Sequence, residues 1–444
     1  MKSPSAVRKQ INVTVFEFGL LSSNAKSVAD QRVHYISVSA YEYLKKCCLC
    51  DETESRFLKL KIAYGMEVLQ VQNYAGVILC PDGTQIEVLP KVAKQAEQED
   101  SAEQARCSLL MMLRSLRQFR HIETESASIK RQKMPLLEIF ISQFLNSVNV
   151  LIKKGIKSEY VRQQSNNLFL KGKLLHSQQL KHNFINRHKF YVEFDAYLTD
   201  KPANRVVHSA LQVVSQYTQF NKNKRLAQEL LFVFDEIPLS RDYKSDFAAI
   251  MLQRGMNHYD APIQWSRLIL EGFSPQSMLG EHNAYSLLFP MEAVFENYVA
   301  KYLAKKVSPP STLLAQVQSK SLVKYGDKDY FRLKPDLYLS RFGDQDIVLD
   351  TKWKLIDRSK STGKDKFGLS QDDFYQMLGY GFKYLKSVGK LVLIYPRTAS
   401  FDKPFENSFN YDEHNGLTLL VVPFDISYQC QERINLSLIG ITSD

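Results

Sequence analysis

Short segments in which hydrophobic and polar residues alternate characterise the N-terminal part of the chain. Residues 11–16 and 57–63 follow this period of two, which is the pattern of a half-buried β-strand. The dipeptide Asp82-Gly83 separates two further apolar runs, as a hairpin turn does. The pattern therefore predicts a β-rich N-terminal region, residues 1–95.

The period changes to that of a helix after a polar segment that runs from Lys94 to Glu103. Apolar residues then recur at helical spacing in three stretches, residues 105–116, 136–145 and 226–234. These stretches predict a mainly helical middle region, residues 96–284.

Helices and strands are predicted to alternate from residue 285 onward. One amphipathic helix is predicted over residues 290–303 and another over residues 369–385, where Ser370 and Asp373 have the spacing of a capping box. Short apolar runs predict strands at 332–340, 347–354, 391–395 and 417–422. The order predicts a mixed sheet flanked by helices in a third domain, residues 285–444, and a multidomain α/β protein as a whole.

Positive charge is concentrated in one part of the middle region. The chain of 444 residues has a formal net charge of +11 and a pI near 9.1. Between Lys153 and Lys189 there are nine Lys or Arg residues and one acid, with Tyr160, Phe169 and Phe184 interleaved. The stretch predicts a surface for the DNA backbone that includes Arg162, Lys171 and Lys173, with an acidic protein as the alternative partner.

Several classes of site and location are not indicated by the sequence. The six cysteines include Cys47-Cys48-Leu49-Cys50, which lacks the spacing of a zinc site, so free thiols are expected. We see neither a signal peptide nor a membrane span and expect a cytoplasmic protein. The phosphate-binding loop G-x-x-x-x-G-K-[ST] is absent, so nucleotide hydrolysis would require another chain.

Two acidic residues and a lysine form the strongest candidate for chemistry. Pro335-Asp336 lies in one predicted strand and Asp350-Thr351-Lys352 in the next, with the turn residues Gly343 and Asp344 between them. An antiparallel hairpin would place the two carboxylates side by side, and alternation would put Asp350 and Lys352 on one face, where we expect the Asp350 carboxylate to face solvent. Paired carboxylates favour a hard cation such as Mg²⁺, and a lysine beside them can stabilise charge on a phosphate.

Other side chains are predicted to approach this pair from the two helices. Glu292 and Glu296 lie four residues apart beside the apolar stripe of the first helix, where a carboxylate can reach the sheet. Gln376 and Tyr380 share one face of the second helix. Alone, each of these residues is more often an ordinary solvated helix position.

Together these residues resemble a known nuclease core. The set Glu296, Pro335-Asp336, Asp350-x-Lys352 and Gln376-x-x-x-Tyr380 resembles the PD-(D/E)xK nucleases, with the Gln-x-x-x-Tyr extension of RecB-like members. Three further stretches, residues 82–91, 105–116 and 167–205, make most of the chain similar to the McrC family, the nuclease subunits of methylation-dependent restriction systems. Helical material around residues 205–285 exceeds that of compact McrC chains, and no role is assigned to it.

The resemblance implies a restriction endonuclease that takes part in antiviral defence. It implies that Mg²⁺ or Mn²⁺ is held by Asp336, Asp350, the Thr351 carbonyl and Glu296, with Glu292 as a less favoured substitute. Lys352 would position water or stabilise charge, and Gln376 and Tyr380 would support the site or contact DNA. The recognised DNA modification is not readable from the chain.

The resemblance also implies two macromolecular partners, double-stranded DNA and a hexameric AAA+ GTPase of the McrB type, which the N-terminal region would engage. Two alternatives remain open at this level. The chain could be a non-catalytic adaptor that stimulates an AAA+ NTPase, or a RecB-like nuclease that works with a helicase. The intact Asp336, Asp350 and Lys352 disfavour the adaptor. The missing C-terminal cysteine cluster, with only Cys430 beyond residue 107, disfavours the helicase-associated nuclease.

Overall fold

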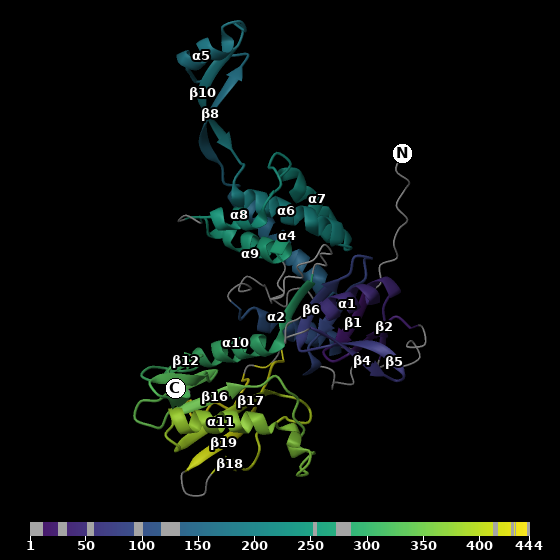
Figure 1. Cartoon of the computed structure of the whole chain (residues 1–444), viewed down its shortest axis with the longest axis vertical. Helices are drawn as coiled ribbons and strands as arrows, with labels where there is room; N and C mark the ends of the chain where they lie inside the picture. Colours follow the sequence, from purple (N-terminus) through teal and green to yellow (C-terminus); the bar gives the residue numbers. More distant parts are fainter. Residues whose placement is uncertain are drawn as a thin grey trace. The chain divides into compact units, whose positions relative to one another are not determined.

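The computed structural model shown in Figure 1 divides the chain into two compact units. Residues 1–136 and 274–444 form unit 1, and residues 137–273, which lie between them in the sequence, form unit 2. The first and last predicted regions therefore share one unit. The residues described are 12–24, 33–50, 57–92, 101–116, 134–251, 255–271, 286–411, 416–427, 430 and 432–441.

The N-terminal part of unit 1 is a β lobe, defined here as residues 12–92 together with strand β11. One four-stranded sheet has the order β1 (Asn12–Phe16), β7 (Gln85–Leu89), β6 (Tyr74–Leu79), β11 (Ser286–Pro290). A second has the order β3 (Val33–Tyr35), β2 (Leu20–Ser22), β5 (Met66–Val71), β4 (Leu58–Ala63). The predicted hairpin at Asp82-Gly83 is confirmed, because β6 and β7 pair antiparallel and Gly83 has a φ of 92°.

One core joins the two sheets of the β lobe. Helix α1 (Val38–Cys50) contributes Leu44, β4 contributes Leu58, and β11 contributes Leu288 to the same buried cluster. Strand β11 comes from the far end of the sequence and pairs antiparallel with β6. Helix α2 (Ser101–Leu113) follows in the chain, and most of the predicted polar segment before it lies outside the described residues.

The C-terminal lobe of unit 1, residues 291–441, is built on a mixed six-stranded sheet. Its order is β12 (Thr312–Ala315), β15 (Leu337–Ser340), β16 (Ile347–Thr351), β17 (Gly389–Pro396), β19 (Leu417–Phe424), β18 (Phe409–Asn410). The central pairs β16–β17 and β17–β19 are parallel, and the others are antiparallel. This arrangement confirms the α/β class and the mixed sheet.

Two helices cover opposite faces of this sheet. Helix α10 (Met291–Ala304) begins directly after β11 and packs Phe295 against Phe424, with ring centroids 6.0 Å apart. Helix α11 (Gln371–Tyr384) packs Met377 in a cluster with Leu391 and Leu419, whose side chains point to the other face. Figure 1 shows α11 lying across β16, β17 and β19. Both helices were predicted from the sequence.

The run predicted as one strand over residues 332–340 is two strands in the structure, so that prediction is wrong. Strand β14 (Lys328–Leu333) pairs with β13 (Lys320–Tyr325) in a separate hairpin, and β15 starts only at Leu337. Pro335 lies at the break, where its missing N–H cannot join a ladder. The β13–β14 hairpin was not predicted, and its strands are mostly exposed, with no buried face that would give a regular alternation of hydrophobic and polar residues.

Unit 2 combines a bundle of helices with a strand-built basic arm, defined here as residues 159–198. The helices are α4 (Leu136–Lys154), α6 (Pro202–Tyr217), α7 (Asn221–Val233), α8 (Tyr243–Ala249) and α9 (Asp260–Glu271). The basic arm contains β8 (Glu159–Asn167), β9 (Lys173–Leu174), α5 (His176–Asn183) and β10 (Phe190–Leu198), with β10 between β8 and β9. The basic stretch thus includes the strands β8 and β9 within the region predicted to be mainly helical.

Buried hydrogen bonds anchor the basic arm to the bundle. The Asn204 side-chain amide donates to the carbonyl oxygens of Lys157 (3.0 Å) and Thr199 (2.7 Å), which lie just outside the two ends of the arm. The Tyr259 hydroxyl donates to Asn204 Oδ1 (2.7 Å) and accepts from Lys157 N–H (2.7 Å). Asn204 therefore has a structural role.

Helix α4 is the one helix in the described part of the chain that is long and apolar enough to span a membrane by length and composition. Of its apolar window, 61% is buried within the structure. Its buried residues include Phe144, Val148 and Leu151, so the helix has the character of a bundle core. Core helices pass the same criterion, which makes this weak evidence for a membrane.

Candidate active site

The hairpin of β15 and β16 brings the two candidate aspartates together. Leu337 is paired with Leu349, so the next residues toward the same end of the hairpin, Asp336 and Asp350, lie opposite each other. Asp336 Oδ2 accepts hydrogen bonds from the Thr351 N–H (2.8 Å) and from Thr351 Oγ1 (2.7 Å). Thr351 therefore fixes the orientation of the Asp336 carboxylate next to Asp350.

Asp350 is buried, with an exposed fraction of 1%, which corrects the expectation of a solvent-facing carboxylate. The reason is that every residue of β16 is buried, because a parallel neighbour and helices on both faces cover the strand. Burial raises the pKa of Asp350, and the nearby Asp336 raises it further, while Lys352 acts in the opposite direction. Lys352 Nζ lies 2.6 Å from Asp350 Oδ2. That oxygen is buried, and the ion pair with Lys352 is the interaction it makes.

Lys352 begins a chain of hydrogen bonds that includes both predicted residues of helix α11. Its ammonium donates to Gln376 Oε1 (2.8 Å), and Gln376 Nε2 donates to the Tyr380 hydroxyl (2.8 Å). Tyr380 in turn donates to the carbonyl oxygen of Lys334 (3.0 Å), two residues before Asp336. Burial lowers the pKa of Lys352, but Asp350 and its neighbouring carboxylates raise it more, so Lys352 is held as a cation.

Of the two candidate glutamates, Glu296 is the one beside the aspartates. Gln316 Nε2 donates to Glu296 Oε1 (2.7 Å), and Gln316 N–H donates to the Asp336 carbonyl oxygen (2.8 Å). Burial and the charge of Asp336 both raise the pKa of Glu296. Glu292, one turn earlier, instead accepts from Asn73 Nδ2 of the β lobe (3.2 Å). Gln316 was missed because it lies in a loop after an unpredicted strand, β12.

A fourth carboxylate near the site, Asp373, was also missed. The capping-box prediction is wrong, because Ser370 makes no side-chain cap and Asp373 faces the sheet. Its oxygens lie 3.0 and 2.8 Å from Lys354 Nζ and accept a bond of 3.2 Å from the Tyr395 hydroxyl. Lys352 Nζ is 4.0 Å away. The sequence signal that could have revealed Asp373 is Lys354, which shares a face with Lys352 in the strand predicted over residues 347–354.

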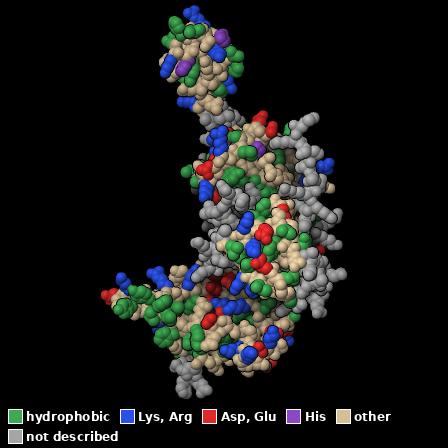
Figure 2. Space-filling view, turned by 45° about the vertical axis from the view of Figure 1, so that its right-hand side comes forward, with side chains coloured by type: hydrophobic (Ala, Val, Ile, Leu, Met, Phe, Trp, Pro, Cys, Tyr) green, Lys and Arg blue, Asp and Glu red, His purple; other side chains and the backbone are tan. Residues whose placement is uncertain are grey.

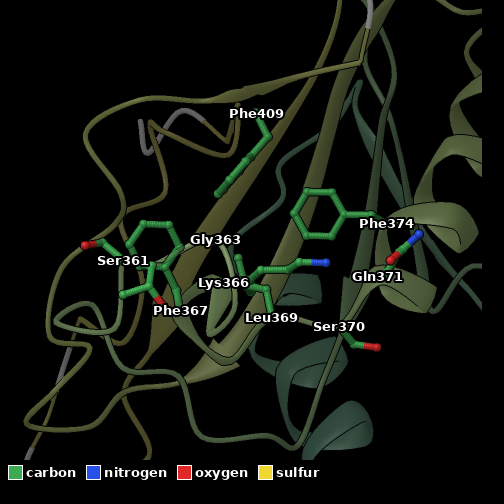
Figure 3. A pocket seen from close by; sticks show the side chains of 10 residues that line it. Ser361, Gly363, Lys366, Phe367, Leu369, Ser370, Gln371, Phe374 and Phe409 are labelled. Atoms are coloured by element: carbon green, nitrogen blue, oxygen red, sulfur yellow. The ribbon is translucent and has the colours of Figure 1, made fainter.

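The first turn of α11 also borders an apolar pocket, shown in Figure 3. Its volume is about 360 Å³. The lining residues are Ser361, Thr362, Gly363, Lys366, Phe367, Leu369, Ser370, Gln371, Phe374 and Phe409. The rings of Phe374 and Phe409 meet edge to face, 5.2 Å apart. The loop of residues 362–368 thus forms one wall of a pocket beside the helix that carries Gln376.

The three residues predicted to bind DNA lie in unit 2, on the basic arm. Lys171 and Lys173 are exposed, and Lys171 Nζ lies 4.2 Å from the centre of the Phe194 ring. Arg162 Nε is 4.0 Å from Glu193 and 3.8 Å from Asp195, and its side chain is 72% exposed. Figure 2 shows Lys, Arg and His side chains next to hydrophobic ones over this arm. The surface is basic and apolar together.

The donor set can be compared with what a divalent cation requires. Among the described residues, no group of three or more His, Cys, Asp or Glu side chains could hold a metal ion by itself. Asp336, Asp350 and the Thr351 carbonyl nevertheless supply only oxygen, and the buried Asp350 oxygen Oδ2 interacts with a cation, the Lys352 ammonium. Mg²⁺ commonly binds one or two carboxylates and keeps water or phosphate oxygens in its other positions. The residues fit Mg²⁺ or Mn²⁺ bound in that way.

Comparison with known proteins gives the fold and the family of the chain. No curated protein matches the chain. One chain of a half-complex of Thermococcus gammatolerans McrB AAA+ hexamers with bound McrC is 18% identical, with a TM-score of 0.67. The similarity covers 93% of this chain and 94% of that one. A chain of the Thermococcus gammatolerans McrBC complex is also 18% identical, with a TM-score of 0.51 over 66% of this chain and 88% of that one.

These similarities, at 18% identity, concern the fold. The family is shown by a separate match, which extends over residues 69–396 and so includes strands β6, β7 and β11 of the β lobe, unit 2, and the hairpin of Asp336 and Asp350. The matching family is described as the McrBC 5-methylcytosine restriction system component. The chain belongs to this family of McrBC restriction system components.

Proposed function

We propose that this chain is the metal-dependent DNA endonuclease subunit of a McrBC-type restriction complex. The observation that carries the proposal is the convergence of Asp336, Asp350 and Lys352 at one end of a hairpin, each fixed by hydrogen bonds or ion pairs. A non-catalytic scaffold has no need to bury Asp350 against a second carboxylate, because such burial is unfavourable without a cation.

Asp336, Asp350 and the Thr351 carbonyl would hold a Mg²⁺ or Mn²⁺ ion, with Glu296 at the edge of the site. When bound, the ion would lower the pKa of water and neutralise charge on the phosphate. Lys352 would stabilise negative charge on the scissile phosphate, and its hydrogen bond to Gln376 orients its ammonium.

We also propose that the chain works with an AAA+ partner. The similar structures are complexes of McrB AAA+ hexamers with McrC, and this chain has no phosphate-binding loop of its own. The N-terminal region, residues 1–95, is the docking module that the sequence favours. The basic arm of unit 2 would contact the DNA backbone through Arg162, Lys171 and Lys173.

The structure changes how docking should be tested. Deleting residues 1–95 would remove β1, β6 and β7 from the sheet that contains β11, and would uncover Leu288 in the shared core. The truncated chain would therefore lose part of unit 1 as well as a docking surface. Point substitutions on exposed side chains of the β lobe, such as Ile62 and Tyr64, are the sharper probe because both are more than half exposed. Equivalent substitutions of exposed apolar side chains on the basic arm serve as the comparison.

The experiment that tests the proposed function uses the full chain with its partner, GTP, Mg²⁺ and DNA that carries 5-methylcytosine. Asp336→Asn and Asp350→Asn keep the size of each side chain but remove the charge that binds a cation. Both should abolish cleavage, while stimulation of the partner's GTP hydrolysis persists. Cleavage at the wild-type rate by either variant would contradict the assignment. An adaptor without nuclease activity would stimulate hydrolysis in every variant, and the wild-type chain would cut nothing.

A further inference from the structure

Lys91 is a buried lysine that the proposed cleavage chemistry does not use. It ends the stretch of residues 82–91, follows strand β7, and has an exposed fraction of 7%. Its ammonium donates to the carbonyl oxygen of Trp353 (2.8 Å), which lies 262 positions away in the sequence. It also donates to Asn73 Oδ1 (3.3 Å) and lies over the Phe18 ring, 4.8 Å from its centre. The β lobe thus contacts the main chain of the C-terminal lobe through a buried charge.

Glu17 provides the counter-charge and holds the other side of the same tryptophan. Its carboxylate accepts the Lys91 N–H (2.9 Å) and the indole N–H of Trp353, at 3.0 and 3.1 Å from its two oxygens. Glu17 is 1% exposed, and burial raises its pKa to about 7. A buried acid and a buried lysine are costly to maintain when apolar residues of similar size could fill the space. Two polar groups of Trp353, its carbonyl and its indole N–H, are held by the β lobe.

Trp353 matters because it directly follows Lys352, where the regular strand stops. Strand β16 ends at Thr351, and the last ladder-type bond beyond it runs from Lys352 N–H to the Ile394 carbonyl oxygen (2.9 Å). The Trp353 ring packs against Phe295 of α10, 5.3 Å between centroids, while the Lys352 ammonium reaches Gln376 of α11. The β lobe and α10 thus fix the carbonyl and the ring of Trp353 on one side of the sheet. Because Lys352 is the preceding residue, this also fixes the direction in which its side chain leaves the main chain on the other side of the sheet.

We propose that Lys91 and Glu17 are positioning residues for Lys352, so that the β lobe sets the geometry of the cleavage site through Trp353. The proposal rests on the proposed endonuclease function, since Lys352 acts there. It gives the lysine of the 82–91 stretch a role distinct from partner docking. It also predicts that the β lobe is required for cleavage even where GTP hydrolysis by the partner is unaffected.

The test uses the double variant Glu17→Gln with Lys91→Met in the full chain. Replacing Lys91 alone would leave a buried carboxylate without its partner and could unfold the lobe. The double variant is neutral, keeps a side-chain oxygen beside the Trp353 indole, and lacks the bond to the Trp353 carbonyl. The matched control is Glu67→Gln with Lys45→Met, which removes a 2.6 Å ion pair from the exposed surface of the same lobe. Both variants are compared for cleavage and for backbone hydrogen exchange.

The turnover number for cleavage should fall roughly 10- to 100-fold in the double variant, because a displacement of about 1 Å at a catalytic group has this effect. The KM for DNA should stay within about twofold of the wild-type value, since Lys352 acts on the reacting phosphate more than on binding. Hydrogen exchange should rise in residues 351–356 and stay unchanged in strand β19. The control variant should match the wild type in all three measurements.

Wild-type turnover by the Glu17→Gln, Lys91→Met variant would overturn the proposal. An equal rise of exchange across the whole lobe, with loss of DNA binding, would also overturn it, because that result describes a structural residue only. If the wild-type chain cuts no DNA, the proposed function fails on its own, and hydrogen exchange then decides the remaining claim. Unchanged exchange in residues 351–356 would show that Lys91 and Glu17 do not hold this segment.

Discussion

The charged residues of the candidate active site in unit 1 and those of the basic arm in unit 2 are organised in opposite ways. In the candidate active site, Asp350 and Lys352 have side chains that are only 2% and 17% exposed, and each is held by a specific partner. On the basic arm, Arg162 is 72% exposed and its nearest carboxylates lie 3.8 and 4.0 Å away. Buried charges interact strongly and are little affected by salt, whereas exposed ones are screened within about 10 Å at 0.1 M salt.

This difference separates two kinds of function. A fixed set of buried charges can act on one bond, because hydrogen bonds and ion pairs hold each charged group in a defined position. A field of exposed lysines and arginines can follow a DNA backbone of any sequence, because phosphate contacts require charge and little geometry. We therefore expect substitutions in the site to change turnover, and substitutions in the basic arm to change affinity and its dependence on salt.

The largest expected effect is that of Lys352→Met, compared with Lys354→Met. Lys352 contacts Asp350 and Gln376, while Lys354 contacts Asp373, which lies 4.0 Å from Lys352. Lys352→Met should lower the turnover number for DNA cleavage by at least roughly 100-fold, the usual cost of removing a group that stabilises transition-state charge. Lys354→Met should cost far less. Equal losses in the two variants would indicate that general charge near the sheet matters and the position of Lys352 does not.

A smaller effect is expected from the basic arm. Lys171→Glu with Lys173→Glu should weaken DNA binding irrespective of sequence, and the slope of log K against log salt should become shallower by about 2, near 1 for each lost phosphate contact. The control is Lys222→Glu with Lys224→Glu, which makes the same charge change on exposed positions of α7. The two pairs are compared by binding titrations at several salt concentrations. The same slope in both pairs would mean that net charge alone attracts DNA and that the basic arm has no particular role.

The sequence was sufficient to predict the elements that depend on local pattern. The hairpin of Asp336 and Asp350 followed from alternation and turn residues, and Gln376 and Tyr380 followed from their spacing on a helix. The concentration of positive charge in the middle region was also visible. These features depend on neighbours within a few positions, which a single sequence displays.

Contacts between distant segments were not predictable in the same way. The bond from Lys91 to Trp353 joins residues 262 positions apart, and no local pattern signals it. Asp373 has the spacing of a capping residue, but its burial against Lys354 and Tyr395 depends on the packing of α11 on the sheet. The same packing buries Asp350, which alternation alone had suggested would face solvent.

The smallest effect concerns pH and distinguishes Glu17 from ordinary surface acids. Burial raises the pKa of Glu17 from 4.5 to about 7, although Lys91 opposes this shift and Glu292 adds to it. The folded chain then holds a proton that the unfolded chain releases. The protonated Glu17 therefore makes its full contribution to the free energy of unfolding below pH 4.5, and this contribution is lost as the pH rises to about 7. The loss should amount to at most about 3 kcal/mol.

Glu17→Gln should remove that part of the pH dependence, as measured by urea unfolding between pH 4.5 and 8. The control Glu67→Gln should leave this pH dependence in place. The bonds of Glu67 to Lys45 and Tyr41 lower its pKa, so its contribution to the free energy of unfolding changes with pH in the opposite direction. A pH profile of Glu17→Gln identical to that of the wild type would show that Glu17 is ionised in the folded chain throughout this range.

The central claim is that Asp336 and Asp350 hold the divalent cation at which DNA is cut. Its most direct test is a Mn²⁺ titration, followed by electron paramagnetic resonance, of the full chain bound to DNA with non-hydrolysable phosphorothioate linkages. The wild-type chain should bind Mn²⁺ at a site that is absent from the Asp336→Asn, Asp350→Asn double variant, with DNA affinity and folding retained. Mn²⁺ binding of equal stoichiometry and affinity in both proteins would contradict the assignment of the site.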